Sequence, residues 1–377
     1  MHSRLSFASL GAGLLLLGEA AAASIRVPNA HRLQRRAGSG PDTEIVSTPA
    51  LVPKVEYIAI SNLTEIVLPK PVDGMIRLPA FRPKDLQFAS DSQPTDENMA
   101  ARGLPDRSGL FPLPVLKEVQ SSDRTLAPYT SIGKVFTRDG HGEVVSTCTG
   151  TMVGSRLFLT ASHCVEDRPD DWSLDFAPAY NANNPNLPPP FGKALRAEKC
   201  YGIDSFSDVG SGDVLEGYDY VVCLLSEPIG LTVGYLGSNT PDSKNPEGLN
   251  VYLGRTWFSA GYPKDILGGQ VLIRAENITI RHVELVALAG TSIDNGKTFV
   301  TPPYPDHGWS GGPLYGVNPT SQDAEIIGIV SAFRHVRSTN DWFTSATHSG
   351  GPRLTKLIAW ARCQWPGWTG ECEGSQP

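Results

Sequence analysis

The sequence predicts an all-β protein of the sandwich or barrel class, and three observations support this. Short runs of apolar and β-branched residues recur after residue 129, each bounded by Gly, Pro, Asn or Asp. No alternation of strands with amphipathic helices is visible there, which argues against a parallel α/β sheet. The 377 residues also include 38 glycines and 31 prolines, a loop-rich composition that stays below the level of low-complexity chains.

The predicted strands follow one another at short intervals along the chain. They cover Gly133 to Thr137, Gly150 to Val153, Leu157 to Thr160, Tyr220 to Leu225, Val271 to Ile273, Glu276 to Ile280 and Ile326 to Val330. Two runs nearer the N-terminus, Val55 to Ile60 and Glu65 to Leu68, alternate in the same way. One helix is predicted over 352–363, where Pro352 precedes apolar residues at steps of three and four, namely Leu354, Leu357, Ile358 and Ala361.

The first 23 residues have the pattern of a secretory signal peptide. Arg4 precedes an apolar run from Leu10 to Leu17, which ends in the small residues Ala20 to Ala23. This run is too short to span a bilayer, and no later stretch approaches 18 apolar residues. We therefore predict a secreted, extracellular protein without a membrane partner, whose six cysteines form disulfides.

Residues 24–118 are predicted to be a pro-region. The segment has no cysteine and many prolines, and its dibasic pair Arg35-Arg36 suits a kexin-like processing enzyme. An accessory binding domain is the alternative. Residues 119–377 then form one functional domain. The sequons at Asn62 and Asn277 predict glycosylation and agree with export, whereas Asn318 is excluded by the proline that follows it.

Charge and motif content exclude several function classes. The 32 basic and 39 acidic residues give a net charge of −7, which provides no attraction to nucleic-acid phosphates or anionic membranes. We therefore predict no nucleic-acid partner. The chain has no zinc motif, P-loop or dinucleotide fingerprint, so we expect neither a cofactor nor a metal.

Three segments within the β framework carry reactive side chains. A strand, a turn and a second strand lead from Cys148 to His163 and Cys164, and a Cys148–Cys164 bond would stabilise the fold by about 3 kcal/mol. Asp219 precedes an apolar strand, where an unpaired carboxylate would cost free energy. Ser310 lies in the glycine-rich segment DHGWSGGP, whose backbone amides can converge on one point.

Together these segments supply what acyl transfer requires. Ser310 would attack a carbonyl, His163 would accept and return its proton, and Asp219 would hold the imidazole tautomer. The amides of Gly308 and Ser310 would form an oxyanion hole, where one donor typically lowers the barrier by about 2.7 to 4 kcal/mol. Asp213 is the alternative acid, but no apolar strand follows its Gly/Ser-rich loop.

The same segments resemble a known family. TASHC at 160–164, YDYVV at 218–222 and GWSGGP at 308–313 are similar, in this order, to the three signature regions of the trypsin-like (chymotrypsin-clan) serine endopeptidases. SSDRTLAPYTSIG at 121–133, CTGTMVG at 148–154, GYLG at 234–237 and SAGYPKD at 259–265 are similar to the glutamyl-endopeptidase branch and its fungal relatives. The resemblance covers roughly residues 121–360.

The resemblance implies two packed six-stranded antiparallel β-barrels with a triad between them and a C-terminal helix. Barrel one would cover about 125–240 and barrel two about 246–345. Ser331 matches the family serine that hydrogen-bonds the triad aspartate, on the strand Gly328 to Phe333 that would pair with substrate. The implied protein is a secreted serine endopeptidase, expected to be a monomer, that hydrolyses protein or peptide substrates through an acyl-enzyme.

The sequence also departs from well-known members of this family. Trp309 stands where trypsin has the aspartate that pairs with a new N-terminal amine, so that route of activation is absent. Tyr304 stands where trypsin has the carboxylate that selects Lys or Arg, and the strand from Ile329 to Ser331 lacks the histidine of glutamyl enzymes. Three nearby histidines are interpreted as solvated surface residues: His307, His335 and His348.

The remaining cysteines and two rival functions complete the predictions. The simplest of the 15 possible pairings joins Cys200 to Cys223 and Cys363 to Cys372. A catalytically silent homologue acting as a binding module is the first rival, motivated by Trp309 and the missing selectivity residue. The second is an α/β-hydrolase esterase with GxSxG at 308–312 and with Asp341 and His348 completing its triad, which leaves TASHC unexplained.

Overall fold

The computed structural model describes residues 54–58, 68–72, 74–89, 113–165, 172–183, 191–203, 217–241, 250–253, 255–286, 296–304, 307–318, 321–337, 342–367 and 371–372. All of them belong to one of the two units of the chain, Thr48–Pro377. The predicted signal peptide 1–23 and the sequon at Asn62 lie outside the described residues. None of the helices in these ranges is long and apolar enough to cross a membrane.

The first half of the body is a closed antiparallel barrel. Its strands are β4 (Ile132–Arg138), β5 (Val144–Met152), β6 (Leu157–Thr160), β7 (Ser173–Pro178), β8 (Leu195–Ile203) and β9 (Val221–Leu225). They pair in the order β7-β4-β5-β6-β9-β8, and the pairing of β7 with β8 closes the ring. Inward-facing apolar side chains fill the barrel, and the rings of Phe158 and Phe176 stack with centroids 4.8 Å apart.

The second half is a larger sheet that also returns on itself. Its main strands are β11 (Thr256–Gly261), β12 (Ile273–Thr279), β13 (His282–Val286), β14 (Gly296–Thr301), β15 (Pro313–Val317), β16 (Ala324–Arg337) and β17 (Trp342–Gly350), and they pair in the order β13-β14-β17-β16-β15-β11-β12. Two residues join β12 to β13, so these two behave as one bent strand and six strands build this barrel. The two apolar runs that were predicted as separate strands around 271–280 belong to one strand, β12. A β-bulge at Asn277, whose φ is 59°, accommodates the interruption of the apolar pattern between them.

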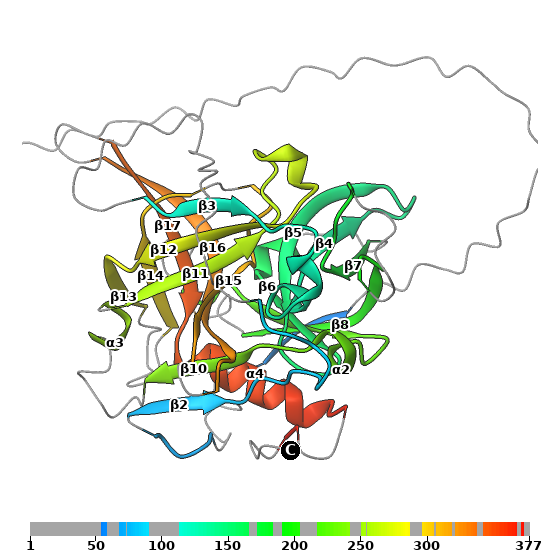
Figure 1. The fold of residues 1–377 in the computed structure, drawn as a ribbon, viewed down its shortest axis with the longest axis horizontal. Coiled ribbons are helices and arrows are strands. Elements are labelled where there is room, and N and C mark those ends of the chain that lie inside the picture. Colours follow the sequence, from blue (N-terminus) through cyan, green and yellow to red (C-terminus); the bar gives the residue numbers. More distant parts are fainter. Residues whose placement is uncertain are drawn as a thin grey trace, which may run out of the picture. The chain divides into compact units, whose positions relative to one another are not determined.

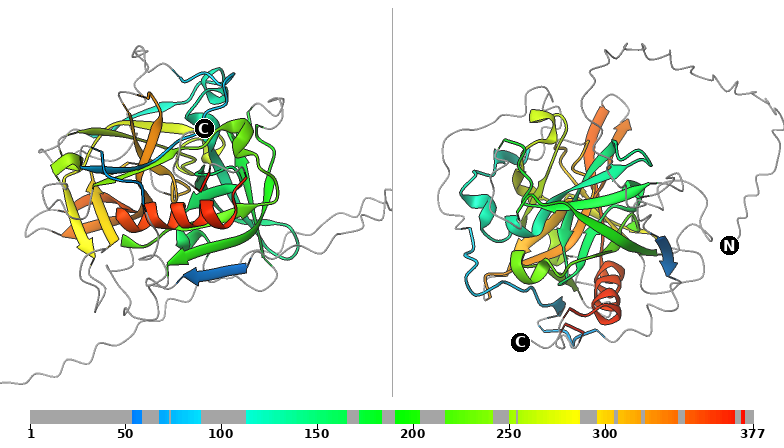
Figure 2. Two further views of the ribbon diagram at one scale, coloured as in Figure 1. Left: turned by 90° about the horizontal axis from the view of Figure 1, so that it is seen from below. Right: turned by 90° about the vertical axis from the view of Figure 1, so that its right-hand side faces the viewer.

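The two barrels lie side by side, and one long helix contacts both. Strands β4 to β8 occupy one side of the view and β11 to β17 the other (Figure 1). Helix α4 (Pro352–Gln364) packs against β9 of the first barrel and against β10 (Gly237–Pro241), β14 and β17 of the second sheet, as a second view also shows (Figure 2). The apolar residues that predicted this helix are all fully buried. The predicted all-β fold with a C-terminal helix is therefore confirmed.

Short elements connect the barrels and shape the loops. They are the helices α2 (Gly230–Val233) and α3 (Asn250–Leu253) and the 3-10 turns Asp123–Thr125, Tyr129–Ser131, Ser162–Cys164 and Leu267–Gly269. The strands of both sheets pair in antiparallel fashion, except that β1 (Lys54–Ile58) pairs parallel with β8 and β10 pairs parallel with β16. This architecture excludes the α/β-hydrolase alternative, which requires a parallel sheet with crossover helices.

The region predicted as a pro-region contributes strands to this body. Besides β1, it supplies β2 (Met75–Leu78), which pairs with β10, and β3 (Val115–Glu118), which pairs with β12. Beyond β2, the ring of Phe81 stacks on Tyr235, and the Pro79 carbonyl accepts a hydrogen bond from Arg362 at 2.9 Å. Processing near residue 118 would therefore break the covalent link between three paired strands and the rest of the body.

Candidate active site

Strand register in the first barrel brings the predicted histidine and aspartate together. Strands β6 and β9 are antiparallel with Thr160 opposite Val221, so continuing the register by two residues places Ser162 opposite Asp219. His163 lies in the 3-10 turn that follows β6, and its side chain is 44% exposed. A disulfide between Cys148 and Cys164 ties this turn to β5.

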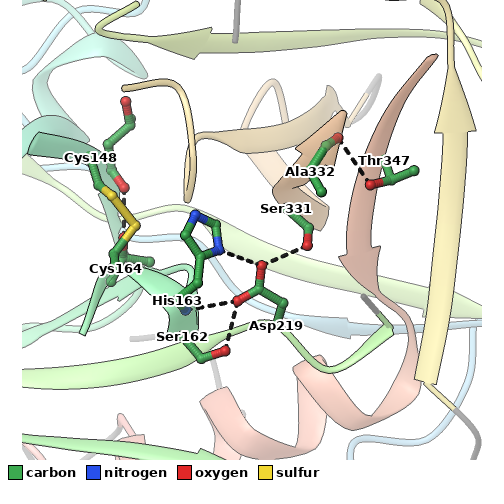
Figure 3. Close-up of polar contacts among 10 residues, drawn as sticks. Cys148, Ser162, His163, Cys164, Asp219, Ser331, Ala332 and Thr347 are labelled. Carbon is green, nitrogen blue, oxygen red and sulfur yellow. Dashed lines mark hydrogen bonds and ion pairs between the residues drawn. A yellow bond between two sulfur atoms is a disulfide. The ribbon is translucent and has the colours of Figure 1, made fainter. Parts of the chain in front are cut away.

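Asp219 is the hydrogen-bonding centre of the site (Figure 3). Its Oδ2 lies 2.7 Å from Nδ1 of His163 and accepts a bond of 2.6 Å from the hydroxyl of Ser331. Its Oδ1 accepts bonds from the hydroxyl of Ser162 at 2.7 Å and from the His163 amide at 3.0 Å. Each carboxylate oxygen therefore has two partners, which fixes both the carboxylate and the imidazole ring.

These partners determine the charge state of Asp219. Burial on its own would raise the pKa of the Asp219 carboxyl, but the neighbouring His163 and the hydrogen bonds from His163, Ser331 and Ser162 together hold that pKa below its ordinary value. A carboxylate that stays ionised favours the His163 tautomer with a proton on Nδ1. That tautomer leaves the lone pair of Nε2 available as a base.

Ser331 reaches Asp219 because of an irregularity in the second barrel. The pairing of β16 with β17 shifts register between Val330 and Ala332, which leaves Ser331 at a bulge. A bulge redirects a side chain out of the regular alternation, and here it turns the hydroxyl toward the first barrel. The family resemblance identified Ser331, although its position at a bulge left no signal in the sequence.

Ser310 lies in a tight turn that is bonded to both of these regions. Its carbonyl accepts a bond of 2.9 Å from the amide of Thr149, the neighbour of Cys148. The following amide, that of Gly311, donates to the carbonyl of Val330 at 2.8 Å, one residue before Ser331. The turn thus connects to the strand behind His163 and to the bulge that bonds Asp219.

Two glycines permit this close approach. Gly311 has φ of +82°, and a Cβ there would meet the Thr149 carbonyl, the Thr160 hydroxyl and the amide of Ala161. Gly308 has φ of +91°, and a Cβ there would meet the carbonyl of Tyr262. Both positions need the left-handed backbone region and the absence of a side chain, which only glycine provides.

Trp309 points into the second barrel. Its side chain is fully buried, the indole N–H donates to the hydroxyl of Ser259 at 2.9 Å, and its ring makes an edge contact with Tyr304 at 5.0 Å between centroids. Gly261 and Gly312 leave room for the indole, because a Cβ at either would lie 2.5 to 2.6 Å from the Cδ1 atom of Trp309. The bulky residue before Ser310 is therefore an anchor for the turn.

The histidines near the serine have different environments, and one expectation is wrong. His307 is exposed, as expected, and the side chain of His335 lies outside the described residues. His348 is fully buried: β17 places it opposite Val330 and Phe299, the Phe299 carbonyl lies 3.3 Å from Nδ1, and the hydroxyl of Tyr304 bonds Nε2. Burial lowers the pKa of His348 to about 4, so it is neutral near pH 7.

Three disulfides join cysteines that are neighbours along the chain. Besides Cys148 with Cys164, they link Cys200 with Cys223 between β8 and β9, and Cys363 with Cys372 after α4. The third holds the buried Glu371 against the first barrel, where its carboxylate accepts bonds from the amide and hydroxyl of Ser155 at 2.6 and 2.7 Å. No sequence pattern predicted this carboxylate contact.

The other candidate residues are distributed as follows. Asn277, the second predicted sequon, is exposed on the bulge of β12 and accessible to modification. Asp213 lies outside the described residues, as does Asp341 of the esterase alternative. The cluster of Cys148, His163 and Cys164 cannot bind a metal through thiolates, since both sulfurs are in the disulfide.

The chain is similar in sequence to known proteins. A family model described as Trypsin matches residues 125–348. A glutamyl endopeptidase of Bacillus licheniformis is 26% identical over 253 residues, which are 66% of this chain and 68% of that protein. An extracellular metalloprotease of Bacillus subtilis is 24% identical over 224 residues, 59% of this chain and 64% of that protein.

Solved structures give weaker matches. A Glu endopeptidase in complex with MPD aligns with a TM-score of 0.46 and 21% identity, covering 66% of this chain and 97% of the other. The protease Anisep from Arthrobacter nicotinovorans aligns with a TM-score of 0.40 and 18% identity, covering 64% of this chain and 97% of the other.

Proposed function

Because the chain belongs to the trypsin family of serine proteases, we propose that it is a secreted endopeptidase with the triad His163, Asp219 and Ser310. The observation that carries the proposal is the bond of 2.7 Å between Nδ1 of His163 and the buried Asp219 carboxylate. This bond favours the tautomer in which Nε2 is the basic nitrogen of the imidazole. The serine turn is bonded to β5, which the Cys148–Cys164 disulfide ties to the His163 turn, and to the carbonyl of Val330, next to the serine that bonds Asp219.

The proposed reaction has two halves. In the first, the hydroxyl oxygen of Ser310 attacks the substrate carbonyl carbon while Nε2 of His163 takes the hydroxyl proton. The amides of Gly308 and Ser310 donate hydrogen bonds to the resulting oxyanion. His163 then gives the proton to the leaving amine, and the peptide C–N bond breaks to leave an acyl-enzyme.

In the second half, water replaces the amine. His163 takes a proton from the water as its oxygen attacks the ester carbonyl, and the same proton returns to Ser310 when the ester bond breaks. Asp219 remains ionised throughout and stabilises the imidazolium. The products are a carboxylic acid and an amine, and the enzyme is regenerated.

The buried cluster beside the serine limits the choice of substrate. Tyr304 and His348 are hydrogen-bonded to each other and buried, and the lowered pKa of His348 keeps it uncharged at neutral pH. Neither therefore presents a charge to a substrate side chain, which disfavours selection of Lys or Arg through Tyr304. The silent-homologue alternative is weakened as well, because the Trp309 indole is directed into the core and away from the solvent-accessible side of the turn.

Substitution of the serine tests the proposal. We expect purified Ser310→Ala to lose hydrolysis of a protein mixture, measured by mass spectrometry of the peptides released, and to lose labelling by a fluorophosphonate probe. Ser321→Ala, at an exposed serine in a turn, is the matched control and should retain both. Hydrolysis by pure Ser310→Ala, or failure of the native protein to react, would overturn the proposal. Mass spectrometry of the purified native protein itself reports the N-terminus of the exported chain and any glycan at Asn277.

A further inference from the structure

The peptide groups of the serine turn are held by hydrogen bonds at every carbonyl. Four consecutive carbonyls, from residue 307 to residue 310, each accept one. The donors are the Lys264 amide to His307, the Thr149 hydroxyl to Gly308 at 2.7 Å, the Gly312 amide to Trp309 at 2.8 Å, and the Thr149 amide to Ser310 at 2.9 Å.

These bonds also determine where the amides of the turn point. In a trans peptide the N–H points away from the carbonyl of the preceding residue. The amides of Gly308 and Ser310 are therefore directed opposite the bonded carbonyls of His307 and Trp309. Within the described ranges, neither of these two amides takes part in a backbone hydrogen bond, so both are available to a ligand.

Thr149 supplies two of the four bonds, and one of them comes from its side chain. Thr149 is fully buried, and its hydroxyl accepts a hydrogen bond of 3.0 Å from the amide of Tyr262 while donating to the Gly308 carbonyl. The hydroxyl thus bridges the end of β11 to the serine turn. The carbonyl that it fixes belongs to Gly308, whose backbone has more conformational freedom than that of a residue with a side chain because it lacks a Cβ.

We propose that Thr149 is a positioning residue for the oxyanion hole, an inference that rests on the proposed peptidase function. Its hydroxyl holds the peptide between Gly308 and Trp309 in one orientation, so that the amides of Gly308 and Ser310 converge before substrate arrives. Removing the hydroxyl leaves the Tyr262 amide and the Gly308 carbonyl without this partner. The peptide between Gly308 and Trp309 can then rotate so that these groups form other hydrogen bonds. Thr149 itself touches no substrate, since it lies behind the turn.

The test compares variants that keep or remove the hydroxyl. Thr149→Val retains the shape of the side chain, and we expect kcat to fall about 10- to 100-fold with KM changed less than about threefold, because the oxyanion hole acts in the transition state. The affinity of a peptide aldehyde, which forms a tetrahedral adduct with the serine, should fall by a similar factor. Thr149→Ser restores the donor and should keep kcat within about threefold of the native value.

A matched control separates this role from general stability. Thr355→Val removes another buried hydroxyl, which bonds Ser238 at 2.9 Å between α4 and β10, and it should leave kcat unchanged. Should Thr149→Val not fold, Thr149→Ala provides the same comparison with less risk of steric conflict. An unchanged kcat and aldehyde affinity in the folded variant, or an equal loss in Thr149→Ser, would overturn the inference. An inactive native protein would instead contradict the proposed function.

Discussion

The two barrels hold their parts of the site by different means. In the first, the turn bearing His163 is linked covalently to β5, and a second disulfide joins β8 to β9, the strand that follows Asp219. The second barrel has no disulfide, since the sequence has no cysteine between Cys223 and Cys363. Its serine turn depends on hydrogen bonds to four carbonyls and on the buried indole of Trp309.

This difference matters because the two kinds of restraint act on different states. A disulfide stabilises mainly by restricting the unfolded chain, by about 3 kcal/mol for loops of this size, and leaves individual side chains to find their own contacts. Hydrogen bonds and close packing fix orientation within the folded state itself. We therefore expect the second barrel to lose function through small local changes that the first barrel would tolerate.

Removing the indole anchor should produce the largest effect. Trp309→Ala leaves a cavity in the second barrel and removes the indole N–H that bonds the Ser259 hydroxyl, so we expect a loss of about 4 kcal/mol in the free energy of unfolding. The turn also loses its anchor, so kcat per folded molecule should decrease. Denaturant unfolding and kcat normalised to the folded fraction measure the two effects.

The same substitution in the first barrel is the control for this comparison. Trp172 is also buried, just before β7, and belongs to the hydrophobic core that includes the first barrel. Trp172→Ala should destabilise the protein comparably while leaving kcat per folded molecule unchanged. If Trp309→Ala kept the native kcat, the indole would be no more than a core residue.

Acid should destabilise the second barrel before it affects the buried aspartate of the first. The pKa of His348 is lowered to about 4 by burial, against an ordinary value near 6.5, so the unfolded chain binds this proton first as pH falls. Above pH 6.5, His348 is neutral in both the folded and the unfolded chain, and the folded state keeps its full stability. As pH falls from 6.5 toward 4, protonation of the unfolded chain lowers the free energy of unfolding by about 3 kcal/mol. The lowered pKa of Asp219 places its own loss below the ordinary carboxyl value.

A variant without the titrating group tests this assignment. His348→Asn should be less stable at pH 7 and should show a shallower slope of unfolding free energy between pH 6.5 and 4. Denaturant titrations at several pH values measure that slope. An unchanged slope would show that other groups account for the acid sensitivity.

The sequence predicted the features that depend on short local segments. His163, Asp219 and Ser310 could be proposed as a triad from the sequence because each lies in a short segment whose residue types suit the chemistry. The all-β class and the C-terminal helix followed from local periodicity, which records which face of an element is buried.

Features that depend on long-range register were not predictable in this way. His348 was expected at the surface, yet pairing of β17 with β14 and β16 places it in the core. The role of Thr149 depends on contacts with Tyr262 and Gly308, which are more than 100 residues away. The strands β2 and β3 were missed because their partners, β10 and β12, lie far along the chain.

The smallest substitution that can distinguish close backbone packing from backbone strain is glycine to alanine at two matched positions. Gly311 and Gly142 both have positive φ, +82° and +80°, so alanine costs about 1 kcal/mol of backbone strain at either. A Cβ at Gly142 would meet nothing within 4 Å, whereas at Gly311 it would meet the Thr149 carbonyl and the segment leading to His163. Only Gly311→Ala must therefore move the turn.

We expect Gly311→Ala to lower kcat/KM about 100-fold, since a displacement of the order of 1 Å at the reacting atoms has an effect of this size. Gly142→Ala should lose only the strain energy and keep native kinetics. Steady-state kinetics and unfolding curves on both variants provide the comparison. Equal losses of activity in the two would mean that strain, and not the contact behind Ser310, sets the requirement for glycine. A selective loss in Gly311→Ala would show that the second barrel positions the proposed nucleophile, Ser310, by close backbone packing.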